Sequence, residues 1–371
     1  MTPIYLDYNA STPIAPAVAR AMRAALTDAF GNPSSPHWAG APARALVEQA
    51  RAEVAALLGC APHEIVFTSG GTESNNLALK GIFFATRRAH PHLITSRVEH
   101  PAIVAPLRFL ERLGACVTWL PVDGQGLVDP EDLRRAIRPE TILISLMHAN
   151  NEVGTIQPIA PCAAIARAHG IPFHTDAAQS VGKIETRVDA LGVDLLSLAG
   201  HKLYAPKGVG ALYARAGTRL EPLLHGAGHE GGRRAGTESA LLTTALGAAC
   251  RLAADRSGMA RVQALRDRLW SGIEARFGAG VVLNGHPDLR LPNTLNCSFI
   301  GASGGEILAG LEGVAASAGS ACHSGESAPS PVLLAMGLPE PIARGAIRFS
   351  LGRETAADEI DTVVRRLTGR A

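Results

Sequence analysis

A lysine follows directly on a stretch that is typical of a buried strand. Residues 194–198 form an apolar run, Ala199 and Gly200 end it, and Lys202 comes two residues later. Ligands of open α/β sheets bind at the carboxyl ends of the strands, where this lysine would stand. A partly desolvated lysine has a lowered pKa and can form a Schiff base with an aldehyde. The alternative is an ordinary surface lysine after a strand.

An acid occupies the same kind of position after another apolar run. Asp176 follows residues 172–175 and precedes Lys202 by 26 residues, which leaves room for a crossover and a second strand. A buried carboxylate needs a positive partner, and the protonated ring nitrogen of pyridoxal phosphate (PLP) is one that Asp commonly serves. Gln179, three residues further on, could donate to the phenolic oxygen of that ring. Alternatively, Asp176 caps a helix.

A glycine pair follows a third apolar run. Residues 64–68 lead into Gly70, Gly71 and Thr72 and then into a polar helix start. Backbone N–H groups at a helix N-terminus bind phosphate, and the Thr72 hydroxyl would add to them. The alternative is a capped helix without a ligand.

Two cationic or titratable side chains extend this set. His100 comes shortly after the apolar run at residues 92–96, where an imidazole could stack on a flat ring and move protons. Arg348 lies within the extended apolar segment 347–350, where a guanidinium group can bind a carboxylate through two hydrogen bonds. A structural histidine and an internal salt bridge are the alternatives.

One cysteine stands apart from the others. The chain has six, which are Cys60, Cys116, Cys162, Cys250, Cys297 and Cys322. They are too sparse for a disulfide scaffold, so reduced thiols are expected, the first five of them mostly buried. Cys322 lies in the small, polar stretch 318–325, and exposed thiols near cationic groups are the reactive ones. With the groups above, it indicates PLP chemistry on an amino acid that carries a leaving group on its β carbon.

The elements that must position these groups alternate along the chain. The extended runs are residues 64–68, 92–96, 116–122, 141–147, 172–175, 194–198 and 209–213. Helical patterns lie among them, such as residues 43–58, 130–137 and 159–168. Continuous apolar strands that alternate with helices predict an α/β fold with a mostly parallel sheet covered on both faces.

The pattern changes after about residue 250. Helical stretches are expected at residues 259–277, 304–312 and 356–367, and extended ones at 281–285, 293–299 and 347–350. With a length of 371 residues, this indicates a second, smaller α+β domain. We expect residues 12–255 to form the large domain, and residues 1–11 and 256–371 the small domain that carries Cys322.

Composition excludes several classes of protein. Hydrophobic residues make up 47%, charged residues 18%, and the net charge is +2 without a basic run, which argues against nucleic acid or an anionic membrane as partner. No apolar stretch reaches the roughly 18 residues of a membrane span, and the first residues do not read as a signal peptide, so a cytoplasmic protein is expected. His225 and His229 are four apart, but the glycines between them argue against a helical metal site, and no metal is expected.

In this order and number, the motifs resemble those of the cysteine desulfurase and selenocysteine lyase group of the class V aminotransferase family. The resemblance runs nearly end to end and includes residues 5–10, 31–35, 68–76 and 150–152. It implies the type I fold of PLP-dependent transferases, with a seven-stranded sheet in the large domain.

The resemblance also implies roles for individual residues. Lys202 would hold PLP, His100 would stack on it and assist catalysis, and Cys322 would form a persulfide. The residues implied in cofactor binding are Gly71, Thr72, His100, Asn151, Asp176, Gln179, Ala199, His201, Lys202 and Thr237. Those implied in substrate binding are Asn32 and Arg348.

Two of these positions carry a further implication. Many desulfurases have a serine where this chain has Ala199, so phosphate binding would depend more on Thr72, His201 and Thr237. Thr237 would reach the phosphate site of a second subunit, which implies a homodimer.

The implied reaction is the conversion of L-cysteine to L-alanine, with the sulfur passing to Cys322 and then to an acceptor protein of iron–sulfur cluster assembly or another sulfur pathway. A selenocysteine lyase, in which Cys322 protonates the selenium that leaves L-selenocysteine, is the alternative. Asn9, residues 321–324 and residues 328–334 are closer to the lyases, whereas Pro101 replaces an acidic residue of the animal lyases and favours sulfur. An ordinary class V aminotransferase, which would not use Cys322, and a non-catalytic sulfur carrier are further alternatives.

Overall fold

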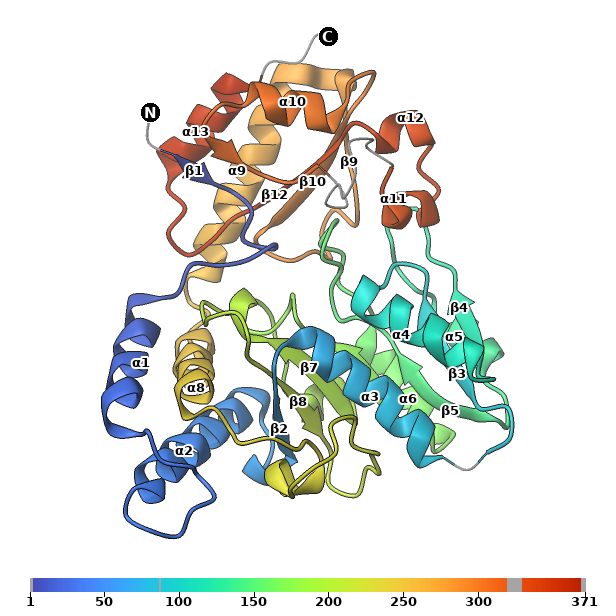
Figure 1. The fold of residues 1–371 in the computed structure, drawn as a ribbon. Coiled ribbons are helices and arrows are strands. Elements are labelled where there is room, and N and C mark those ends of the chain that lie inside the picture. The colour runs from blue at the N-terminus through green and yellow to red at the C-terminus, as the bar shows by residue number, and fades with distance from the viewer. Residues whose placement is uncertain (1–2, 87, 319–328, 368–371) are drawn as a thin grey trace.

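The centre of the fold is a seven-stranded sheet with the order β2-β8-β7-β6-β5-β3-β4 (Figure 1). The computed structural model describes residues 3–86, 88–318 and 329–367. The strands of this sheet are β2 (Ile65–Thr68), β3 (His92–Ser96), β4 (Cys116–Leu120), β5 (Thr141–Ser145), β6 (Phe173–Asp176), β7 (Leu195–Ala199) and β8 (Gly210–Ala214). Only β8 runs against its two neighbours, β2 and β7. The prediction of a mostly parallel seven-stranded sheet is therefore confirmed.

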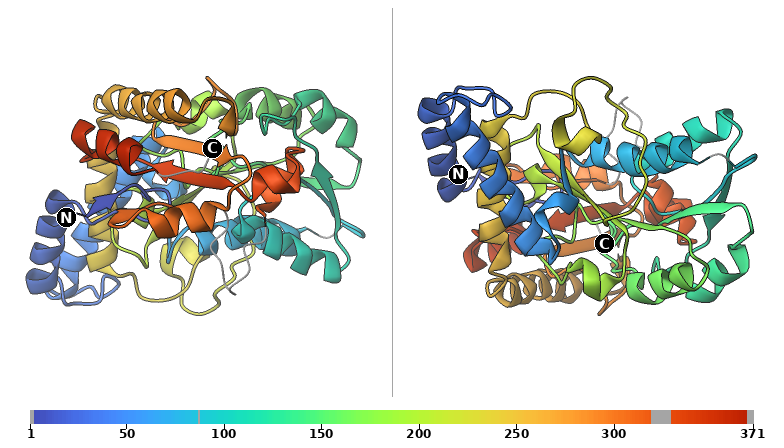
Figure 2. Two further views of the ribbon diagram at one scale, coloured as in Figure 1. Left: turned by 90° about the horizontal axis from the view of Figure 1, so that it is seen from above. Right: turned by 90° about the horizontal axis from the view of Figure 1, so that it is seen from below.

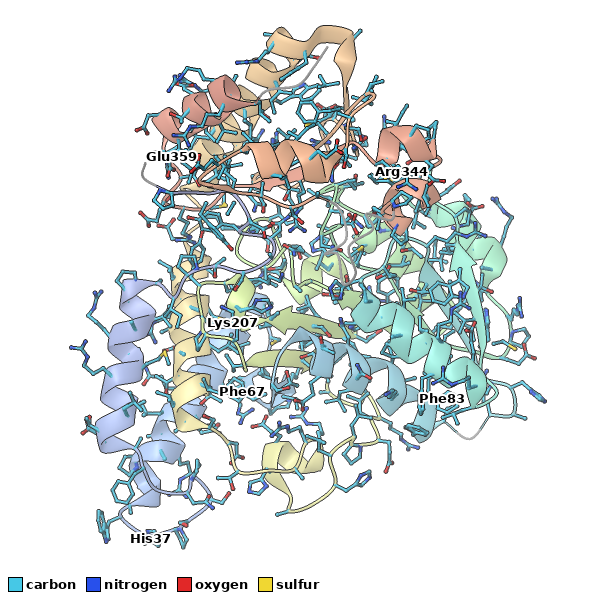
Figure 3. All side chains as sticks on the ribbon, turned by 45° about the horizontal axis from the view of Figure 1, so that its top comes forward. His37, Phe67, Phe83, Lys207, Arg344 and Glu359 are labelled. Atoms are coloured by element: carbon cyan, nitrogen blue, oxygen red, sulfur yellow. The ribbon has the colours of Figure 1, made fainter. Side chains whose placement is uncertain are left out.

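Alternate residues of strand β2 enter different hydrophobic clusters. On β2, Ile65 and Phe67 join the cluster on one face of the sheet, and Val66 joins the cluster on the other. Side chains of a strand point to opposite faces in turn, so a strand buried on both faces is apolar throughout. Phe67, labelled in Figure 3, is buried in the interior, whereas His37, labelled in the same figure, is exposed on the surface.

Helices cover both faces of the sheet (Figures 1 and 2). One face packs against α3 (Gly71–Ala85) and α4 (Pro101–Arg112). The helices that share the other cluster, or flank it, are α1 (Pro16–Asp28), α2 (Gly40–Leu58), α5 (Pro130–Ala136), α6 (Ile159–Ala168), α7 (Val188–Leu191) and α8 (Ala240–Ala254). The short 3₁₀ helices are η1 (Pro62–Glu64), η2 (Gly200–Lys202), η3 (His229–Gly232) and η4 (Gly278–Gly280).

A third hydrophobic cluster joins the two ends of the chain. It forms around an antiparallel sheet in the order β12-β10-β9, and a parallel pair of strands, β1 and β11, lies beside it. The strands are β1 (Ile4–Tyr5), β9 (Val281–Leu283), β10 (Thr294–Phe299), β11 (Val314–Ala315) and β12 (Ala346–Ser350). Its helices are α9 (Met259–Phe277), α10 (Gly304–Gly310) and α13 (Ala357–Arg366). The short helices α11 (Pro331–Ala335) and α12 (Glu340–Ala343) pack in a separate, smaller cluster. Ile4 and Leu6 are buried in the third cluster, which brings the N-terminal segment across to the C-terminal elements.

The strongly patterned elements match their predictions closely. The predicted helices at residues 159–168 and 259–277 coincide with α6 and α9, and the predicted strand at residues 92–96 coincides with β3. In the part of the chain that the structure describes, no helix is long and apolar enough to span a membrane.

Candidate active site

A cavity of about 650 Å³ opens at the carboxyl ends of the strands of the large sheet. Segments that follow five strands, β2, β3, β5, β6 and β7, supply its walls, and the N-terminal segment and β12 close it from the other side. The predicted site residues that line it are Gly71, Thr72, His100, Asn151, Asp176, Gln179, Ala199, His201, Lys202 and Arg348. The fold therefore brings together ten residues that are spread over most of the chain.

Lys202 lies in η2, directly after β7, and points into the site rather than out to solvent. Its Nζ donates to the carbonyl oxygen of Ala10 at 2.8 Å and also to that of Asn9. Burial and then the positive charge of Arg348 lower the pKa of Lys202 to about 8, against the opposing carboxylates of Asp7 and Asp176. The neutral amine that attacks an aldehyde is thus accessible near neutral pH.

The lowered pKa leads to a prediction on the cofactor-free protein. Reaction of Lys202 with an amine-directed reagent should rise with pH and reach half its maximum near pH 8, because only the neutral amine reacts. At pH 7 about 10% of Lys202 would be neutral, compared with well under 1% of an ordinary lysine. Mass spectrometry of the labelled peptides measures the extent of reaction of Lys202 at each pH, and the exposed Lys207 serves as the internal control. A midpoint of Lys202 equal to that of Lys207 would contradict the prediction.

Asp176 ends β6 as a buried carboxylate. Its Oδ1 accepts from the backbone N–H of Ala178 at 2.9 Å, and its Oδ2 accepts from Nδ2 of Asn75 at 2.7 Å. A turn follows rather than a helix, so the alternative of a helix cap does not apply. Among the residues that the structure describes, Asp176 has no ion-pair partner. A buried carboxylate that lines a cavity without an ion-pair partner among the described residues is suited to bind a cationic ring nitrogen.

Asn75 is a site residue that motif analysis passed over. It lies inside the Thr72-containing motif, on the face of α3 that turns toward the cavity, and is buried. Its donation to Asp176 Oδ2 orients that carboxylate, and its own Oδ1 is buried without a partner among the described atoms. Its place within residues 68–76, three residues after Thr72, was the available signal.

The start of α3 forms one end of the cavity. Its N-cap, Gly70, supplies no side-chain cap, so the first N–H groups of the helix are not used by a local side chain. A Cβ atom at Gly71 would lie 3.2 Å from the Cβ of Ala199, which shows how closely β7 approaches this end. Glu73 in the same turn pairs with Arg234 at 2.8 Å, so its charge is balanced. These features fit a phosphate group better than a self-contained capped helix.

His100 combines a local and a site position. It is the N-cap of α4, and its Nδ1 accepts from the backbone N–H of Ala102 at 3.0 Å. The neutral ring therefore carries its proton on Nε2. Partial burial lowers the pKa of His100, as does Lys202, while Asp176 opposes this. The ring lines the cavity, where it could stack on a flat ring, and its lowered pKa favours the neutral form.

Arg348 on β12 makes the internal salt bridge that was the alternative to ligand binding, and it also lines the cavity. Its Nη2 pairs with Oδ1 of Asp7 at 2.7 Å, and its Nη1 donates to the carbonyl oxygen of Asn151 at 2.9 Å. Its Nε is buried without a hydrogen-bond partner among the described atoms. Asp7, which motif analysis noted only as part of residues 5–10, is therefore part of the site.

Two of the predicted residues that the structure describes do not line this cavity. Asn32 is exposed in the turn before α2, where its Oδ1 accepts from the N–H of Ser34 at 2.9 Å. Thr237 is exposed in the loop before α8. Cys322 lies outside the described residues.

The other cysteines are a mixed group. Cys162, Cys250 and Cys297 are buried, and burial raises the pKa of each thiol to about 12. Cys60 is half-buried and Cys116 is exposed at the edge strand β4, so the expectation that the first five are mostly buried holds for three. The described residues contain no group of three His, Cys, Asp or Glu side chains able to hold a metal ion.

Comparison with known proteins places these observations in one family. The family model described as "Aminotransferase class-V" matches residues 4–363. A relative named cysteine desulfurase IscS, from Dictyoglomus turgidum, is 49% identical over 96% of this chain and 92% of its own length. Among solved structures, a NifS-like protein superimposes with a TM-score of 0.92 at 34% identity, over 99% of this chain and 98% of that one. A structure titled "SspA in complex with cysteine" gives a TM-score of 0.85 at 40% identity, over 94% and 98%. The chain belongs to the class V aminotransferase family.

Proposed function

We propose that this protein is a PLP-dependent cysteine desulfurase that converts L-cysteine to L-alanine and takes up the sulfur as a persulfide on Cys322. The observation that carries the proposal is the shared cavity of Lys202, with a pKa of about 8, and Asp176, a buried carboxylate without an ion pair among the described residues. The relatives named as cysteine desulfurases support the choice of sulfur over selenium.

The site residues would hold the cofactor from several sides. Lys202 would bind its aldehyde carbon, Asp176 its ring nitrogen, and the start of α3 with Thr72 and His201 its phosphate. Gln179 and Asn151 would face its phenolic oxygen, and His100 would stack on its ring. PLP, when bound, supplies a ring that accepts electrons from the substrate carbon.

The protein groups would then carry out the proton and sulfur transfers. Arg348 would hold the α-carboxylate, and the freed amine of Lys202 would remove the α proton. The Cys322 thiolate would attack the substrate sulfur, so that an S–S bond forms as the C–S bond breaks and its electron pair stays with the substrate carbon. Protonation of that carbon completes alanine.

The proposal extends to the assembly and setting of the enzyme. Asn32 would contact the substrate, and Thr237 would reach the phosphate site of the other subunit in a homodimer. Residues 12–255 would form the large domain, and residues 1–11 and 256–371 the small domain. A separate acceptor protein, of iron–sulfur cluster assembly or another sulfur pathway, would receive the sulfur in the cytoplasm.

Product analysis tests the proposed function. The purified protein is incubated with L-cysteine and a thiol, and alanine, sulfide and keto acid are measured, with L-selenocysteine in parallel. We expect equal amounts of alanine and sulfide. Formation of a keto acid from L-cysteine when an amino-group acceptor is supplied would instead indicate an ordinary aminotransferase and overturn the proposal.

Replacing the carboxylate-binding arginine should affect KM more than kcat. Arg348→Lys removes a two-pronged, charge-assisted contact worth roughly 1.5–3 kcal/mol, so the KM for L-cysteine should rise about 10- to 100-fold. Arg344→Lys, at an exposed arginine that directly follows α12, is the matched control. An unchanged KM with a loss confined to kcat would show that Arg348 does not hold the substrate.

A further inference from the structure

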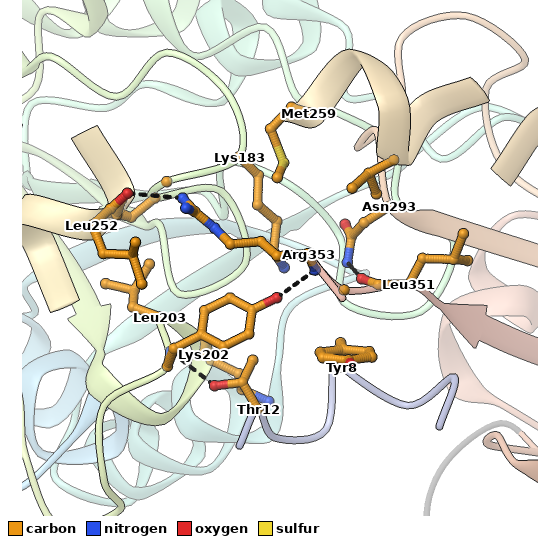
Figure 4. Close-up of a pocket in the computed structure, with 16 residues that line it drawn as sticks. Tyr8, Thr12, Lys183, Lys202, Leu203, Leu252, Met259, Asn293, Leu351 and Arg353 are labelled. Atoms are coloured by element: carbon orange, nitrogen blue, oxygen red, sulfur yellow. Dashed lines mark hydrogen bonds between the residues drawn. The ribbon is translucent and has the colours of Figure 1, made fainter. Parts of the chain in front are cut away.

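A second lysine lies behind Lys202 and does not belong to the main cavity. Lys183 lines a separate cavity of about 30 Å³, on which Lys202 also borders (Figure 4). Gly182 before it has φ of +75°, and a Cβ there would lie 2.8 Å from the Cβ of Ala253, so a glycine is needed where the chain turns. That turn directs the Lys183 side chain toward residues that line the main cavity.

The amine of Lys183 meets the oxygens of two side-chain amides. Its Nζ donates to Oε1 of Gln179 at 3.1 Å and to Oδ1 of Asn9 at 3.3 Å. Burial, and the nearby charges of Lys202 and Arg348, lower the pKa of Lys183 to about 7. A neutral amine still has two N–H groups for these two oxygens, so the pattern of donation is the same on either side of that pKa.

These contacts decide which way each amide faces. With its oxygen bound to Lys183, Gln179 directs its Nε2 to the carbonyl oxygen of Asn9 at 3.0 Å. The second hydrogen of that NH₂ group remains for the cavity that Gln179 lines. If the amide were turned over, Gln179 would present an acceptor there instead.

Asn9 is held in the same manner and links both lysines. Its Oδ1 also accepts from Asn293 at 3.0 Å, and its Nδ2 donates to Thr294 at 2.8 Å. Its carbonyl oxygen accepts from both Lys202 and Gln179. The amine of Lys183 therefore braces the residue on which Lys202 rests.

We propose that Lys183 is a positioning residue that fixes the amide of Gln179 with its N–H groups toward the cofactor's phenolic oxygen. The proposal rests on the proposed function, which assigns Gln179 to that oxygen. A donor to the phenolic oxygen withdraws negative charge that otherwise stabilises a proton on the cofactor-linked Nζ of Lys202. Loss of the donor should therefore raise the pKa of that nitrogen.

The test is a pH titration of the visible absorption of the cofactor-loaded protein. Lys183→Met should raise the midpoint by about one pH unit, the equivalent of one neutral hydrogen bond. Gln179→Leu should shift it in the same direction, and the double variant should move no further than Gln179→Leu alone, because both changes remove one interaction. Asp7, His100, Asp176, His201 and Arg348, the charged and titratable groups around Lys202, stay unchanged throughout.

Three controls separate positioning from a general structural effect. Lys80→Met, on α3 and outside both cavities, should leave the midpoint in place. Lys183→Arg keeps a donor-only cation and should restore most of the wild-type midpoint. Lys183→Ala, titrated in the same way, replaces Lys183→Met if that variant does not fold.

The outcomes distinguish the two proposals. Absence of a cofactor band in the wild-type protein would overturn the proposed function itself. A band whose midpoint moves with Gln179→Leu but not with Lys183→Met would overturn the role of Lys183 alone. A midpoint that neither change moves would show that Gln179 is not the donor, and the role of Lys183 would fall with it.

Discussion

Replacing Lys202 by alanine is expected to abolish both the turnover of L-cysteine and the visible absorption of bound PLP at neutral pH. The amine of Lys202 has a pKa lowered to about 8, and the residue lies directly after β7, where it lines the same cavity as Asp176. The same amine would anchor the cofactor and remove the substrate proton, so activity should fall by about 10³-fold or more.

Lys80→Ala is the control for this change. Lys80 lies on α3 outside the cavity and contacts the ring of Phe109 at 4.6 Å from its centroid. Its loss should cost only about 0.5–1 kcal/mol of stability and leave absorption and turnover in place. Retention of both properties in Lys202→Ala, with Lys80→Ala unaffected, would refute the assignment of the cofactor lysine.

Replacing Cys322 by alanine should stop the formation of alanine from L-cysteine while PLP remains bound. The cofactor contacts proposed above come from Lys202, Asp176 and the start of α3, and the substitution alters none of these residues. The lost function is the nucleophile that receives sulfur, so the visible band should persist in a protein with at least about 100-fold less activity.

The matched control for Cys322 is Cys116, an exposed thiol on the edge strand β4 and outside the cavity. Cys116→Ala should retain full turnover, because an exposed thiol away from the cofactor cannot receive the substrate sulfur. Alanine release by Cys322→Ala at the wild-type rate would show that another group accepts the sulfur. With L-selenocysteine, the same pair of variants measures how far selenium release depends on the thiol.

The large sheet could be predicted because its strands are buried on both faces. A strand such as β2 is buried at all four positions and apolar at three of them, which makes it visible in the sequence without any partner. The order of the strands in the sheet could not be predicted in this way. The apolar runs of β2 and β8 give no sign that β8 lies antiparallel between β2 and β7. That order depends on how the crossovers pack.

The short elements near the chain ends illustrate the opposite case. β1 and β11 are two residues each and form a two-stranded pair, so neither run is long enough to show a period. Their pairing depends on the N-terminal segment crossing to the C-terminal cluster, where Ile4 and Leu6 are buried. Such contacts between distant parts of the chain leave no local pattern.

The identity of the chemistry followed from the sequence, because it depends on residue types in a fixed order along strand ends: an aldehyde-binding lysine, an acid for a ring nitrogen, a glycine-rich helix start and a cysteine among small polar residues. The contacts that orient these site residues were decided only by the tertiary structure. Asp7 pairs with Arg348, Asn75 orients Asp176, and Lys183 and Asn9 brace Gln179 and Lys202. These partners lie up to 341 residues apart, and a hydrogen bond over such a separation is set by packing in three dimensions rather than by spacing along the chain.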